Sequence, residues 1–204
     1  MKSILFNAFL FVSFIANAQF MKDDKFIGGT FYATVQKSSN GSNSEGNYSS
    51  CTLSPSGGFF LNDKYAIGGG IGYSVTRQKY EYDPDVNQEY RINAVEVHAF
   101  ASRYFVIADR FFFRATGSLY YDREHRIEEN NDAEFKSKSY TIGINIRPSL
   151  LFFPTSNWGI EAGIGNFGIS HWRSLSYENK STSVSLDYGS FYLGFAYYFR
   201  TPRG

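Results

Sequence analysis

Cysteine, net charge and long apolar segments are what this sequence has least of. Cys51 is the only cysteine in 204 residues, which excludes an intramolecular disulfide and a zinc site built from cysteines. The 20 basic and 19 acidic residues nearly cancel, so no broad basic surface indicates nucleic acid as a partner. Aromatic residues make up 19% of the chain, which is too many for a disordered protein.

The one continuous apolar segment lies at the start of the chain. Lys2 precedes an apolar stretch from Ile4 to Ala16, and Ala16-Asn17-Ala18 is a small-x-small cleavage site. This pattern predicts a secretory signal peptide over residues 1–18. The stretch falls short of the about 20 residues that a membrane helix needs. We therefore expect an exported protein with one domain over residues 19–204.

After the signal peptide the hydrophobicity alternates with a period of two. From Tyr65 to Thr76 the odd positions are apolar apart from one glycine, and the even positions are small or polar. Side chains alternate across a strand, so such stretches predict two-faced strands. Eight of them follow one another, which predicts an all-β, antiparallel fold. Their approximate ranges are 26–37, 47–61, 64–79, 90–107, 110–127, 135–153, 157–172 and 182–199.

The expected connections alternate between short and long. Short ones are residues 62–63, 108–109 and 154–156, whereas polar ones span 38–46, 80–89, 128–134 and 173–181. Tight turns at one end and longer loops at the other are typical of an up-and-down transmembrane barrel. Aromatic residues gather near both ends, as the two aromatic girdles of such a barrel require. The first group is Phe59, Phe60, Tyr65, Tyr104, Phe105, Phe111, Phe152, Phe153 and Trp158. The second group is Tyr80, Tyr82, Tyr90, Tyr120, Tyr121, Tyr140 and Trp172.

Two segments resemble a known family. Tyr192, Gly194, Tyr197 and Phe199 resemble the C-terminal signature that outer-membrane barrels present to the barrel-assembly machinery. Residues 53–73 carry Pro55, a short turn and a glycine-rich strand, and resemble the second hairpin of the outer-membrane β-barrel domain family, small porin-like proteins of Gram-negative bacteria. The resemblance implies an eight-stranded barrel in the outer membrane, surrounded by its lipid and lipopolysaccharide. It implies no single activity.

In a membrane barrel the apolar face points to lipid and the polar face lines the lumen, whereas a soluble lipocalin-like barrel has the opposite arrangement. The small residues of the polar face favour the membrane barrel. Parity then places Arg114, Arg147, Glu96 and Glu161 inside, where we expect a charge network that fills the lumen. Asp122 is expected to face Glu96. Arg103 falls on the lipid face, so it either extends to the membrane interface or follows a bulge.

The functional expectation is a non-enzymatic barrel, monomeric and without cofactor or metal. Its lumen is expected to be filled by side chains, and its outer loops to serve a structural or surface-interaction role. Three alternatives remain open at this point: a narrow channel, a lipid A-modifying enzyme and a soluble ligand carrier. The enzyme alternative depends on Ser170 and His171, which are adjacent and therefore point to opposite faces of a strand.

Overall fold

Antiparallel strands make up almost all of the described chain. The computed structural model describes residues 20–40, 44–83, 86–130 and 133–200. Its strands are β1 (Lys25–Asn40), β2 (Ser44–Phe60), β3 (Tyr65–Asp83), β4 (Val86–Ala108), β5 (Phe111–Asn130), β6 (Ala133–Phe152), β7 (Trp158–Ser174) and β8 (Lys180–Phe199). The prediction of an all-β, antiparallel fold is confirmed. The predicted signal peptide lies outside the described residues. No described helix is long and apolar enough to cross a membrane.

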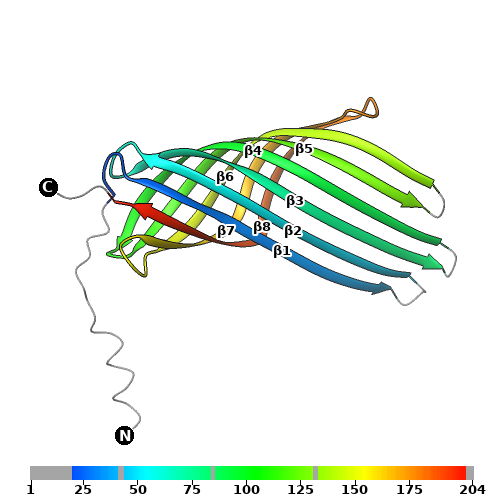
Figure 1. Ribbon diagram of the computed structural model, residues 1–204, viewed down its shortest axis with the longest axis horizontal. Coiled ribbons are helices and arrows are strands. Elements are labelled where there is room, and N and C mark those ends of the chain that lie inside the picture. The colour runs from blue at the N-terminus through cyan, green and yellow to red at the C-terminus, as the bar shows by residue number, and fades with distance from the viewer. Residues whose placement is uncertain (1–19, 41–43, 84–85, 131–132, 201–204) are drawn as a thin grey trace, which may run out of the picture.

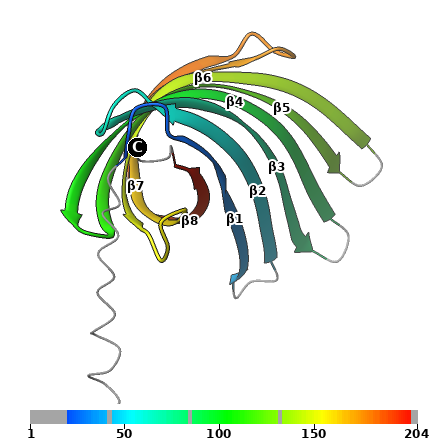
Figure 2. The ribbon, with the colours of Figure 1, turned by 60° about the vertical axis from the view of Figure 1, so that its left-hand side comes forward.

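Each strand pairs with the next, and β8 returns to β1, so that the sheet closes into a barrel (Figure 1). The closing seam is the shortest pairing, because it runs only from Lys25 opposite Phe199 to Phe31 opposite Leu193. Beyond this point the described parts of β1 and β8 have no register partners in each other. The tip of the β7–β8 hairpin lies apart from the tip of β1 in both overall views (Figures 1 and 2). The barrel is therefore tightest at the end with the short turns.

The long connections predicted from the sequence are wrong at three of the four places. β1 continues to Asn40 and β2 already begins at Ser44, and the next two hairpins are extended in the same way, leaving only residues 41–43, 84–85 and 131–132 between strands. Residues 175–179 form the remaining connection at this end. The prediction took polar composition as a loop signal. A strand outside an apolar environment needs only its backbone partners, and its side chains are free to be polar on both faces.

The outer face of the barrel carries an apolar band. Every outward residue of β5 from Phe111 to Tyr121 is uncharged, and on β6 the same holds from Phe152 to Tyr140. Outward apolar side chains on other strands are exposed too, with Val35 of β1 at 76% and Ile71 of β3 at 60%. Charged residues follow immediately beyond the band on β5 and β6. The band therefore has about the 9–11 residues per strand that cross a bilayer at a tilt.

Arg103 interrupts the band close to its short-turn edge. Its side chain lies outward, opposite Tyr65 in the neighbouring strand. The guanidinium carbon lies 5.4 Å from the centre of the Tyr65 ring and 4.7 Å from that of Phe105. The register irregularity of β4 falls between Val106 and Ala108, beyond Arg103. Of the two explanations considered, extension toward the interface with the aliphatic stem along the surface fits the structure, and a shift of register at Arg103 does not.

Candidate functional site

The interior is closed at the short-turn end by a cluster of packed aromatic side chains, which we call the aromatic floor. It centres on Phe20, which is only 2% exposed. Its ring stacks on Phe60 with the centroids 4.1 Å apart and lies 4.8 Å from the Tyr104 ring. The aromatic rings of Phe26, Phe112, Phe153 and Tyr198 complete the floor, together with the aliphatic side chains of Ala66 and Leu151. The sequence predicted that the polar face of the strands lines the lumen, and this is wrong at the short-turn end, where the inward side chains are aromatic.

The segment that carries Phe20 is fastened to the barrel by backbone and charge. Asp23 donates its amide hydrogen to the Phe60 carbonyl at 2.9 Å, and the Phe60 amide donates to the Asp24 carbonyl at 2.8 Å. Arg200 contacts the same segment, with its Nη1 3.4 Å from Asp24 Oδ2. The Arg200 guanidinium also covers the Phe20 ring at 4.8 Å from its centre. The segment before β1 and the residue after β8 thus meet at the floor and close the barrel at this end.

Above the floor, the structure brings together two of the four predicted network residues. Arg114 Nη2 donates to both carboxylate oxygens of Glu161, at 2.5 and 2.6 Å. Both side chains are largely buried, with 14% and 10% exposure. Tyr192 donates its hydroxyl to the same carboxylate at 3.0 Å. Arg147 joins indirectly, because its guanidinium lies over the Tyr192 ring at 5.8 Å. A paired and hydrogen-bonded charge of this kind is tolerated in an interior.

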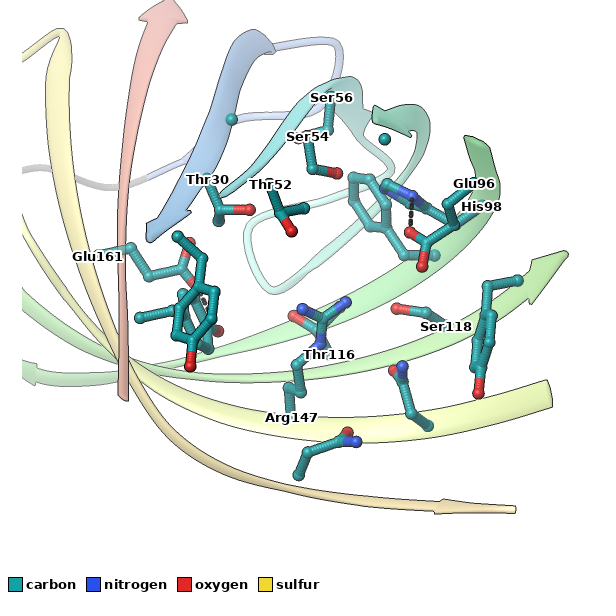
Figure 3. A pocket seen from close by; sticks show the side chains of 18 of the residues that line it. Thr30, Thr52, Ser54, Ser56, Glu96, His98, Thr116, Ser118, Arg147 and Glu161 are labelled. Atoms are coloured by element: carbon teal, nitrogen blue, oxygen red, sulfur yellow. Dashed lines mark hydrogen bonds and ion pairs between the residues drawn. The ribbon is translucent and has the colours of Figure 1, made fainter. Parts of the chain in front are cut away.

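Glu96, the fourth predicted member, belongs to a different cluster. Its Oε1 lies 2.9 Å from His98 Nδ1, and both residues lie on β4 (Figure 3). Asp122 is its direct neighbour on β5, as expected. Parity alone placed all four charged residues inside the barrel. It did not reveal their height along the axis, which depends on the stagger between strands.

A cavity of about 510 Å³ remains above the floor, so the lumen is only partly filled. Hydroxyl groups from β1, β2 and β5 line it together with the charged groups described above (Figure 3). The space exists because several aromatic side chains lie flat against the wall over glycines of the next strand. Tyr192 is the tightest case: a Cβ added to Gly163 would lie 1.9 Å from its ring. Such aromatic–glycine pairs are a recurrent feature of curved sheets.

The predicted aromatic girdles are only partly present. At the short-turn end Tyr65, Phe105, Phe111 and Trp158 are exposed on the outside, whereas Phe60, Tyr104 and Phe153 point inward to the floor. At the other end, Tyr121 and Tyr140 stack outside with centroids 5.9 Å apart. Tyr80, Tyr90, Tyr120 and Trp172 have the inward parity. Proximity to a turn therefore predicted at which end of the barrel an aromatic residue lies, but not whether its side chain points inward or outward.

The residues of the predicted assembly signal divide between the two faces of β8. Tyr192 and Gly194 face the lumen, where Tyr192 meets Glu161. Tyr197 and Phe199 face outward, with their ring centres 5.0 Å apart. The Tyr197 ring also contacts Trp158 at 5.3 Å. The outward pair is therefore part of the apolar surface at the short-turn end.

Ser170 and His171 do not form a catalytic pair. The Ser170 hydroxyl lies 3.0 Å from the hydroxyl of Ser183, and His171 Nδ1 lies 2.9 Å from Thr182 Oγ1. The two contacts are on opposite faces of β7, as the adjacent positions predicted. Within the described residues no group of three or more His, Cys, Asp or Glu side chains is arranged to hold a metal ion.

Sequence reasoning missed the residues that close the floor, namely Phe20, Asp24 and Arg200. A signal was present for the first of these. Phe20 stands directly after the predicted cleavage region and before the first alternating strand. Phe26, Phe60 and Phe112 also place aromatic rings on the otherwise polar face at strand ends. Aromatic residues of inward parity at the short-turn end would have indicated a packed floor.

Comparison with known proteins gives matches only among solved structures. No protein-family model and no curated protein matches the chain. The outer membrane protein OprG from Pseudomonas aeruginosa aligns with 90% of this chain and 99% of its own, at 12% identity and a TM-score of 0.46. Neisserial surface protein A aligns with 86% of this chain and 97% of its own, at 16% identity and a TM-score of 0.43. Ail of Yersinia pestis aligns with 88% of this chain and 99% of its own, at 12% identity and a TM-score of 0.44. Similarity at this level assigns no function to the chain.

Proposed function

We propose that this protein is an outer-membrane β-barrel whose outward apolar band lies in lipid and whose lumen is closed by the aromatic floor. The band is the observation that carries the proposal. Apolar side chains around the outside of a closed sheet have no favourable contact in water. A closed sheet also pairs most of its backbone groups, as lipid requires; here the β1–β8 seam is paired from Lys25 to Phe31 and not beyond. A soluble ligand carrier, with its apolar face inside, has the opposite arrangement.

The route to the membrane follows from the two ends of the chain. Residues 1–18 direct export as a cleavable signal peptide. Tyr192, Gly194, Tyr197 and Phe199 then engage the barrel-assembly machinery. The short turns and both ends of the barrel chain lie on the periplasmic side, which leaves the long hairpin ends outside the cell. The protein works as a monomer, without nucleic acid, cofactor or catalytic activity.

The floor favours a structural or surface-interaction role over a channel. Phe20 and its neighbours fill the periplasmic end, and the buried pair of Arg114 and Glu161 lies directly above them. The cavity of about 510 Å³ is therefore a blind cavity, closed by the floor at its lower end. In place of loops, the extended ends of β1 to β6 are what the protein presents to the surroundings. An ion current through the purified barrel in a planar bilayer would contradict this role and support the channel.

Cysteine accessibility tests the band directly. In a Cys51→Ser background, Ile144→Cys introduces a thiol in the middle of the band, and Lys136→Cys introduces one beyond it. In lipid vesicles a charged thiol reagent should modify the second variant and spare the first, and both should react after denaturation. Membrane fractionation and a heat-dependent shift in gel mobility test insertion independently. Equal labelling of the two thiols in the folded protein would refute the membrane orientation.

A further inference from the structure

A row of basic side chains crosses the outside of four neighbouring strands just beyond the apolar band. In the hydrogen-bonded register, Arg123 of β5 lies opposite Tyr140 of β6, which lies opposite Arg173 of β7. Arg173 in turn lies opposite Lys180 of β8. Lys138 follows two residues beyond Tyr140 on the same face. We call Arg123, Lys138, Arg173 and Lys180 the basic row.

The four members of the basic row are exposed and have no carboxylate within ion-pair distance among the described residues. Two other cations of the same outer region are neutralised by a neighbouring carboxylate. Lys136 Nζ lies 2.5 Å from Glu134 Oε1, and Arg91 Nε lies 2.8 Å from Glu89 Oε1. The hydrogen bond with Glu134 raises the pKa of Lys136. Lys37 of β1 and Arg77 of β3 are also exposed, outward and without a described carboxylate within ion-pair distance, but only on β5 to β8 do such cations lie on consecutive strands.

The register row directly next to the basic row is mixed and consists of Tyr121, Ile142, His171 and Thr182. The surface beyond this row, toward the short turns, is apolar. Leu119, Ile144, Ile169 and Val184 form one register row across the same four strands. All four are between 41% and 68% exposed. Gly117, Ile146, Phe167 and Leu186 form the next row toward the short turns. One face of the barrel thus combines an apolar surface several strands wide with unpaired positive charge along its outer edge.

We propose that this face binds a phosphorylated lipid of the outer leaflet, with its phosphates on the basic row and its acyl chains on the two apolar rows beyond the mixed row. The inference rests on the proposed function, which places this end of the barrel at the outer surface. Charge complementarity carries it: guanidinium and ammonium groups form strong charge-assisted hydrogen bonds with phosphate oxygens. Their position at the edge of the band matches the depth at which a headgroup lies above its acyl chains.

Titration of lipid A into the purified mature barrel tests the proposal, with dephosphorylated lipid A as the second ligand. One basic residue near an anionic membrane surface contributes about 1 kcal/mol, or about fivefold in affinity. Arg123→Gln/Arg173→Gln should therefore weaken lipid A binding about 25-fold. Lys138→Gln/Lys180→Gln should weaken it similarly. Lys136→Gln is the control variant. It removes one positive charge from β6, the strand of Lys138, but from a residue that is already paired with Glu134. It should change the affinity for lipid A less than twofold.

The dephosphorylated ligand should bind weakly and equally to the parent and every variant, and added salt should reduce the difference between the two ligands. Equal binding of lipid A by the parent and both double variants would overturn the proposal, as would equal affinity for the two ligands. The heat-dependent mobility of each variant reports folding separately. A parent chain that stays in solution without detergent would instead refute the proposed function itself.

Discussion

Replacement of Phe20 by alanine tests the idea that the first described residue completes the barrel interior. The ring lies within 5.7 Å of five other aromatic centroids and beneath the Arg200 guanidinium. Removal of a buried phenyl ring costs about 3–5 kcal/mol through lost transfer free energy and an unfilled cavity. We expect the lower end, about 3 kcal/mol, because water reaches the end of the barrel and fills part of the space.

Urea unfolding of the barrel in phosphatidylcholine vesicles measures this cost, with the fluorescence of Trp158 and Trp172 as the signal. Phe20→Leu keeps most of the volume and should lose less than about 1.5 kcal/mol. Met21→Ala is the matched control, since the Met21 side chain is 39% exposed, and it should stay within about 0.5 kcal/mol of the parent. If Phe20→Ala unfolds at the same urea concentration as Met21→Ala, the N-terminal segment is not part of the floor.

Two further predictions concern the lumen above the floor. Glu161→Gln leaves the Arg114 charge buried without its partner and should lower the free energy of unfolding by about 3–5 kcal/mol. Glu96→Gln changes a more exposed carboxylate and should lower it by less than about 1 kcal/mol. Equal losses of the two variants in urea unfolding would contradict the assigned pairing of Glu161 with Arg114. Gly163→Ala places a Cβ 1.9 Å from the Tyr192 ring and should cost about 1–3 kcal/mol by overpacking. Gly117→Ala, which meets no atom within 4 Å, should unfold like the parent, and the same result for both alanines would show that Tyr192 does not lie on Gly163.

Local alternation was sufficient to predict the strands. The pattern from Tyr65 to Thr76 depends only on neighbouring residues, and β3 covers it completely. The same pattern failed at the outer ends, where polar residues such as those of 128–130 continue β5. There the strand is held by its backbone partners in the next strand, and no apolar face is needed to stabilise it. The change from apolar to polar residues therefore marks the end of the apolar band, but it does not mark the end of the strands.

The interior depended on contacts between segments far apart in the chain. Parity predicted that Arg114 and Glu161 share the lumen. Their pairing, and the separation of Glu96 from them, required the stagger of the strands around the barrel. The floor is a stronger example, because Phe20, Phe60, Phe112 and Phe153 come from four separate regions and meet only when the sheet closes.

The sequence by itself determined which side chains share a face, because alternation along an extended backbone is a local geometric property. It also determined that the apolar face has the length of a membrane crossing. Only the tertiary structure decided the height of each residue along the barrel axis, since that depends on the register of every strand against its neighbours. That height decided which inward residues seal the floor, which charges form pairs, and which outward cations are left without a partner.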